Sequence, residues 1–252
     1  MLTQAQKDTY EKTGFVVLRG FLSPRIVRDC LDEITAVFLD QAKKMNRLPP
    51  AGNDLDDLVR SVMVPGTPER SFVYDFVRNI RPLRVVEILP EVREVLRDLG
   101  LEQPICLEIP SLRFDTPGEE TFLTKHHQDI RSIRGERCVT VWFPLRPCGP
   151  RHGSLAVLEG SHRLGLLKHV IEDRHVRVAD LEALPPDRYP RRIVEGDAGD
   201  IVFMNSFCVH VSHPNPSDAI KINGQFFYND ARAVRFGDVF ESLKSVPDYR
   251  AL

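Results

Sequence analysis

Hydrophobic residues recur at helical spacing through much of the first hundred residues, which predicts amphipathic helices there. A Ser-Pro pair typical of a helix start precedes one such series, whose apolar members are Ile26, Cys30, Ile34 and Phe38. We predict further helices over residues 3–13, 71–80 and 83–99, a short strand at Phe15–Leu18 and a loop at 46–57. The N-terminal region is therefore expected to be mainly helical.

From Pro104 onward the pattern changes to short runs of β-branched and aromatic residues separated by Gly, Pro and Asp. Runs of this kind are typical of the strands of a β-sandwich or barrel. We predict strands at 105–114, 138–145, 154–158, 201–211 and 220–228. The whole pattern predicts one α+β domain with a mainly β core, in which a helical flank (1–103) covers one face of the core (104–230) and a tail (231–252) follows.

Composition narrows the class of protein. The 252 residues include 34 Lys and Arg against 36 Asp and Glu, a net charge of -2 that disfavours a nucleic-acid partner. Hydrophobic residues make up 42%, yet no apolar run approaches the ~18 residues of a membrane span, and the amino end lacks the pattern of a signal peptide. The 5 cysteines are scattered without a Cys-x-x-Cys pair, which fits neither a disulfide framework nor a zinc knuckle. We expect a reduced, cytoplasmic protein without a membrane partner, and its oligomeric state stays open.

All 8 histidines fall between residues 126 and 213, inside the strand-rich half. The sharpest local feature is His127-Gln128-Asp129, because residues i and i+2 of an extended chain lie on the same face and can bind one ion. His210, at the end of a long apolar run, supplies a third candidate ligand. Two imidazoles and one carboxylate leave coordination positions open, as in non-haem Fe(II) oxygenases and unlike a closed structural zinc site.

The remaining histidines are weaker candidates. His213 is the alternative to His210, but it is displaced by an odd number of residues and precedes Pro214, where the strand is expected to end. His126 is expected to point to the strand face opposite His127. The other loop-like histidines, expected to be exposed, are His152, His169 and His175.

Several motifs occur together and in order. His-Gln-Asp at 127–129 is followed by the Trp142 strand, by Gly-Ser-Leu at 153–155 before Gly-Ser-His at 160–162, and by His-x-Ser-x-x-Asn at 210–215. Over most of its length, from about residue 14 to 230, the sequence resembles the phytanoyl-CoA dioxygenase family of Fe(II)/2-oxoglutarate oxygenases. The resemblance implies a double-stranded β-helix (a cupin-like jelly roll) with flanking helices, iron ligands His127, Asp129 and His210, and His162 near the cavity rim.

The resemblance also implies a 2-oxoglutarate site. The family holds the distal carboxylate with a basic residue eleven positions after the distal histidine, aided by the serine two positions after it; these are Lys221 and Ser212 here. Gln128 and Trp142 match positions that line the cosubstrate site, although Trp142 also fits a plain core position. The family usually has arginine where this chain has Lys221. Lysine offers a single point charge in place of a bidentate fork, so weaker cosubstrate binding is expected.

The implied activity uses Fe(II), 2-oxoglutarate and O2 to hydroxylate an unactivated C–H bond of a small molecule, with release of succinate and CO2. Asp129 argues against a halogenase, which usually lacks the carboxylate ligand, whereas desaturation and ring closure stay open. Arg113 and Arg131 are candidates for binding an anionic substrate group, since a guanidinium pairs with carboxylates and phosphates; the alternative is that both are surface charges. The loops 117–120 and 134–137 are candidates for the cavity lip.

Two other classes of protein stay open. One is a non-catalytic jelly-roll protein that binds metal or ligand without turnover, favoured only by the lysine at position 221. The other is a cupin-like enzyme that uses zinc or manganese and no oxo acid. Dependence of activity on 2-oxoglutarate separates both from the oxygenase.

Overall fold

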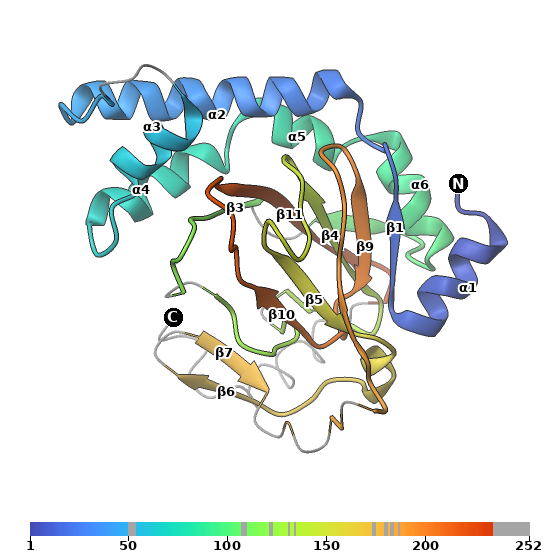
Figure 1. Cartoon of the computed structure of the whole chain (residues 1–252). Helices are drawn as coiled ribbons and strands as arrows, with labels where there is room; N and C mark the ends of the chain where they lie inside the picture. The colour runs from blue at the N-terminus through green and yellow to red at the C-terminus, as the bar shows by residue number, and fades with distance from the viewer. Residues whose placement is uncertain are drawn as a thin grey trace.

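The computed structural model describes residues 1–49, 54–106, 110–120, 123–130, 132–133, 135–172, 175–178, 181, 184–185 and 187–233. Within them, antiparallel sheets form the core and helices cover one side of it (Figure 1). The N-terminal half supplies most of the helices and the residues after Pro104 supply most of the strands, as the hydrophobic pattern predicts. None of the helices in these ranges is long and apolar enough to cross a membrane.

The helices begin and end at residues whose chemistry suits a helix terminus. Thr3 and Gln6 form a capping box at the first helix, and Gly14 ends it in the left-handed conformation (φ 88°). Ser23 caps the second, accepting from the Ile26 amide. The helices are α1 (Gln4–Thr13), α2 (Pro24–Lys44), α3 (Leu55–Val62), α4 (Pro68–Val77), α5 (Arg81–Glu87) and α6 (Pro90–Asp98), with a 3-10 turn η1 (Ser161–Leu164).

Two sheets face each other as a jelly roll. The larger has the order β1-β9-β4-β11-β2, with β3 also paired to β11, and the smaller has the order β10-β5-β8. A separate hairpin, β6-β7, lies at the end of the molecule away from α2 (Figure 1). The strands are β1 (Phe15–Leu18), β2 (Pro104–Cys106), β3 (Ser111–Asp115), β4 (Cys138–Pro144), β5 (Ser154–Leu158), β6 (His169–Glu172), β7 (His175–Val178), β8 (Arg191–Ile193), β9 (Ile201–Asn205), β10 (His210–His213) and β11 (Lys221–Asp230).

Side-chain alternation divides the large sheet into two faces. The outward face packs against the helices: Phe114 of β3 meets Phe38 of α2 edge-on with ring centroids 5.2 Å apart, and Ile222 and Phe226 of β11 join the same core. The inward face packs against the small sheet through a second cluster that includes Trp142. Polar residues that alternate with the helix-facing ones must therefore point between the two sheets, where the candidate site lies.

The structure corrects two of the predicted helical boundaries. The single helix expected over 83–99 is two helices, α5 and α6, because Pro90 lacks the amide hydrogen needed to continue a helix and instead starts the second one. The loop expected over 46–57 ends earlier, since the Asp54 carboxylate accepts from the amides of Asp56 and Asp57 and starts α3.

Two strand predictions are also corrected, and one hairpin was missed. The run 105–114 is split into β2 and β3, and residues 107–109 lie outside the described ranges. The run 201–211 is interrupted after Asn205, whose side chain and carbonyl accept from the amides of Phe207 and Cys208 and so turn the chain from β9 into β10. The β6-β7 hairpin was not predicted, and His169 in it is buried (9% exposed) rather than on an exposed loop.

Gly224 allows β11 and β4 to pack closely. A Cβ at this position would lie 2.1 Å from the Cζ atom of Phe143 on β4. We predict that Gly224→Ala lowers the free energy of unfolding by about 1–3 kcal/mol because the overpacked ring must shift. Denaturant unfolding of the single variants and of Gly224→Ala combined with Phe143→Leu measures this effect. The free energy of unfolding of the double variant should fall by less than the sum of the decreases in the two single variants. Strict additivity of the two decreases would contradict the steric explanation.

Candidate active site

The backbone brings the two candidate histidine ligands together. The amide of His127 donates to the carbonyl of His210 and the amide of His210 donates to the carbonyl of His127, both at 2.9 Å. This reciprocal pair extends the edge of β10 and places the two imidazole centroids 4.2 Å apart. Asp129, two residues further along, completes the group.

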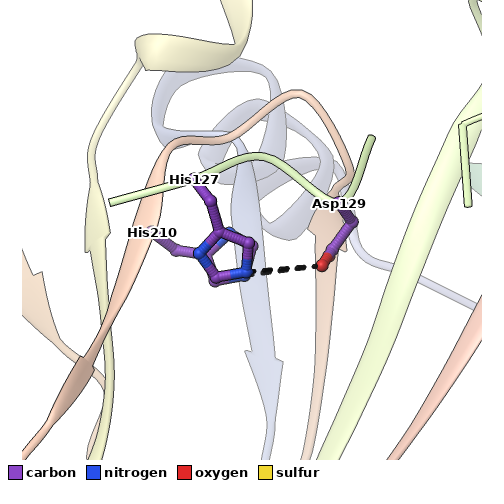
Figure 2. A group of neighbouring side chains, drawn as sticks. All are labelled: His127, Asp129 and His210. Atoms are coloured by element: carbon purple, nitrogen blue, oxygen red, sulfur yellow. Dashed lines mark ion pairs between the residues drawn. The ribbon is translucent and has the colours of Figure 1, made fainter. Parts of the chain in front are cut away.

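The three side chains converge on one point. The Nε2 atoms of His127 and His210 lie 3.8 and 3.7 Å from the same Oδ1 atom of Asp129 (Figure 2). Potential ligand atoms of the three residues all lie within 4.8 Å of one another. Each ring is oriented through its Nδ1, which lies 2.8 Å from the Lys125 carbonyl in His127 and 3.1 Å from the Cys208 carbonyl in His210. With Nδ1 donating, both rings present Nε2 as a metal ligand.

The protonation state of His127 suits a ligand as well. Burial and the adjacent His210 ring hold the pKa of His127 well below its usual range, so the imidazole is neutral near pH 7. Metal binding requires the unprotonated ring. His213 is not in the group: its Nε2 lies 3.3 Å from the Pro150 carbonyl, so of the two histidines His210 is the candidate distal ligand.

Two hydroxyl groups hold Asp129 in place. Thr140 of β4 donates to the Oδ2 atom of Asp129 at 2.7 Å, and the Thr140 hydroxyl lies 3.0 Å from that of Ser206. Thr140 and Ser206 are each 1% exposed. The bond to Oδ2 turns Oδ1 toward the histidines. Sequence reasoning missed both residues, although Thr140 precedes Trp142 by two positions and so shares its face of the strand.

A charged cluster lies on the inward face of β3 and β11. Lys221 is buried and pairs with Asp115. Arg113 donates to the Asp115 Oδ1 atom at 3.0 Å and reaches across to the Ser212 hydroxyl at 3.4 Å. Burial lowers the pKa of Lys221, and Asp115 partly offsets that effect. Burial alone would raise the pKa of Asp115, yet Arg113 and Lys221 hold it below its usual range.

Gln128 and Trp142 occupy different settings. Gln128 is 1% exposed, and its amide is bound to backbone: it donates to the carbonyls of Gly165 and Phe207 and accepts from the amide of Leu167. Both of its amide hydrogens are thus used. Trp142 is buried in the cluster between the sheets, on the same face of β4 as Thr140.

The remaining candidates are placed as follows. Arg113 belongs to the charged cluster, Arg131 lies outside the described residues, and His162 lies with its Nε2 3.2 Å from the Glu11 carbonyl beside α1. Of the two expected lip loops, residues 117–120 are tied to α4 by a two-bond ion pair between Arg70 and Glu119. A cavity of about 550 Å³ lies beside the segment that precedes His127 but is not lined by the three candidate ligands; its lining residues are Leu123, Thr124, Lys125, His126, Arg177, Leu181, Val211 and Ser212.

Two imidazoles and one carboxylate inside a jelly roll form a candidate metal site of the kind found in non-haem oxygenases. A family profile described as phytanoyl-CoA dioxygenase (PhyH) matches residues 10–223. The chain therefore belongs to the phytanoyl-CoA dioxygenase family, and it is a dioxygenase of that family, as the sequence motifs predict.

Characterised relatives and solved structures agree with this assignment. A 1-deoxypentalenic acid 11-beta-hydroxylase from Streptomyces arenae is 26% identical over 220 residues, which cover 82% of this chain and 73% of that enzyme. A methylphosphonate hydroxylase from Gimesia maris is 24% identical over 248 residues, covering 95% and 84%. The crystal structure of EctD from S. alaskensis with 2-oxoglutarate and 5-hydroxyectoine has a TM-score of 0.64 at 17% identity and covers 93% of this chain and 78% of that one. The jelly-roll prediction is thereby confirmed.

The Thr140 hydroxyl generates a prediction about metal affinity. Thr140→Val keeps the shape of the side chain but removes the donor to Asp129, so we expect a 10–100-fold weaker affinity for Mn(II) or Fe(II), roughly the effect of losing a partner of a metal ligand. Thr140→Ser keeps the hydroxyl donor and should therefore keep the wild-type affinity for the metal. Anaerobic titration calorimetry measures the affinity, and Thr35→Val, which removes a hydroxyl that donates to Leu31 within α2, is the matched control. An unchanged affinity in Thr140→Val would remove Thr140 from the site.

Proposed function

We propose that this protein is an Fe(II)- and 2-oxoglutarate-dependent dioxygenase that hydroxylates a C–H bond of a small molecule and releases succinate and CO2. The observation that carries the proposal is the convergence of His127, Asp129 and His210, since two imidazole nitrogens and one carboxylate oxygen suit Fe(II). When bound, Fe(II) supplies the O2 activation that couples oxidative decarboxylation of 2-oxoglutarate to hydroxylation. The chain supplies the ligands, the cosubstrate site and the surrounding cavity.

The residues of the charged cluster would hold the cosubstrate. Lys221 supplies the buried positive charge for the distal carboxylate, and the Ser212 hydroxyl, on the facing sheet, supplies a hydrogen bond. Trp142 lines the space between the sheets. Because the Gln128 amide is already bound to backbone, we assign Gln128 to fixing the segment between the two ligands rather than to touching the oxo acid.

Two features bear on the substrate. The names of the two hydroxylases similar to this chain specify an acid and a phosphonate, which fits a small-molecule substrate here. Arg113 is engaged with Asp115 and Ser212, which favours a role at the cosubstrate end of the cavity over direct binding of substrate. A substrate role for Arg131 stays a prediction.

The 5 free cysteines fit a reducing compartment such as the cytoplasm.

The first test removes the carboxylate ligand. Asp129→Ala should abolish Fe(II)-dependent conversion of 2-oxoglutarate to succinate, because two imidazoles alone do not provide the anionic ligand. Succinate is measured by mass spectrometry in the presence of O2 and Fe(II). Asp218→Ala, which removes an exposed carboxylate outside the site, should keep the wild-type rate. Wild-type succinate formation by Asp129→Ala would overturn the proposed metal site.

The second test addresses the cosubstrate. Lys221→Ala should raise the concentration of 2-oxoglutarate needed for half-maximal rate by roughly 10–100-fold, the loss of one charge-assisted bond of about 1.5–3 kcal/mol. Lys221→Arg should stay within a few-fold of wild type because it keeps the charge. Steady-state rates at varied 2-oxoglutarate give the values, with circular dichroism as the check on folding. An unchanged requirement in Lys221→Ala would assign the residue to the scaffold.

A further inference from the structure

Two cross-strand pairs form a square of polar side chains on the inward face of β3 and β11. Lys221 lies opposite Asp115, and Asn223 lies opposite Arg113. The intervening residues Phe114 and Ile222 belong to the helix-facing core, so the alternation of both strands points the square toward the small sheet. The Cα atoms of Lys221 and Asn223 are about 7 Å apart along the strand, and the two side chains leave the same face as neighbours.

The charges of the square do not cancel. Asp115 contributes one negative charge and contacts both Lys221 and Arg113, so the three ionised groups sum to one positive charge. Lys221 is 5% exposed and Asp115 7%, which places this charge where water screens it little. A single carboxylate that enters the square would neutralise this positive charge, whereas a second anionic group would leave a net negative charge.

Asn223 is the unusual member of the square. It is 0% exposed, and within the described part of the chain neither its Nδ2 nor its Oδ1 atom has a hydrogen-bond partner. Two other buried asparagines are satisfied: Asn229 donates to the Ser132 carbonyl, and Asn215 donates to the carbonyls of Asp115 and Ala219. Buried amides are nearly always hydrogen-bonded, because an amide without a partner in the interior has lost its hydrogen bonds to water without replacing them. A polar group of a bound ligand would supply the partner that the Asn223 amide lacks.

We propose that Asn223 contacts the cosubstrate, its Nδ2 donating to the carboxylate that Lys221 holds, and that Asp115 sets the square to accept one carboxylate. This inference rests on the proposed function and names the residue that selects an oxo acid with a charged end. An amide suits the position because it donates without adding charge, whereas an aspartate there would repel the incoming carboxylate.

The test measures binding without turnover. The full-length protein is loaded with Mn(II) under nitrogen and titrated with 2-oxoglutarate and with 2-oxopentanoate, which has the same length but ends in a methyl group. Trp142 is the only tryptophan and lies between the sheets, so its fluorescence follows occupancy. The variants are Asn223→Ala, Asn223→Ser and Asn223→Asp. Gln225→Glu is the matched control, because it adds a charge one repeat further along the same face of β11.

The expected result is a loss of affinity for 2-oxoglutarate alone, the oxo acid with the charged end. Asn223→Ala should weaken 2-oxoglutarate binding by about 10-fold and Asn223→Asp by about 100-fold or more, while the affinity for 2-oxopentanoate stays unchanged. Asn223→Ser, which keeps a donor, should fall between wild type and Asn223→Ala. Gln225→Glu should weaken binding less than Asn223→Asp.

Other outcomes overturn the inference. Unchanged 2-oxoglutarate affinity in Asn223→Ala, or equal losses for both oxo acids, would show that Asn223 does not contact the distal carboxylate. Equal effects of Asn223→Asp and Gln225→Glu would reduce the result to general repulsion. If Asn223→Asp does not fold, the alanine and serine variants decide alone. Failure of the wild-type protein to bind 2-oxoglutarate would instead reject the proposed function, and the inference with it.

Discussion

The reciprocal backbone pairing of His127 with His210 is the constraint on which the site depends. The two residues are far apart in sequence, and these two hydrogen bonds bring their side chains to one face of the small sheet. Neighbouring bonds hold the same segment: Ser212 donates to the Thr124 carbonyl on one side, and Val178 of β7 donates to the His126 carbonyl on the other. Residues 124–127 thus connect β10 to the β6-β7 hairpin through backbone hydrogen bonds. Of these residues, His127 forms a β-bridge, with His210.

The inward faces of the two sheets carry two kinds of chemistry at separate places. Two imidazoles and a carboxylate form the candidate metal site, with Thr140 and Ser206 fixing the carboxylate. Cationic groups around Asp115 form the proposed cosubstrate site, and Ser212, two residues after His210, connects the two sheets there through Arg113. A ligand with an oxo acid at one end and a carboxylate at the other could bind the metal through the first and the cationic groups through the second. The helices pack against the outer face of the large sheet (Figure 1).

Much of this arrangement was predictable from sequence because it follows local rules. The spacing of His127 and Asp129 and the helix start at Ser23 follow from periodicity and capping, whereas the expectation that Trp142 lines the cosubstrate site came from the family resemblance. The features that were missed depend on tertiary contacts. Residue 169 reads as part of a charged loop, yet its Nε2 accepts from the Gln128 amide in a buried pairing. Asp115, Thr140 and Asn223 carry no motif; their importance comes from strand register, which places each beside a group distant in sequence.

The claim that these three side chains share one metal ion is tested most directly by an anomalous diffraction map of crystals grown with Fe(II) under nitrogen. The account predicts one strong iron peak about 2 Å from both histidine Nε2 atoms and from an Asp129 carboxylate oxygen. Iron bound elsewhere, or held by only one of the two histidines, would contradict it.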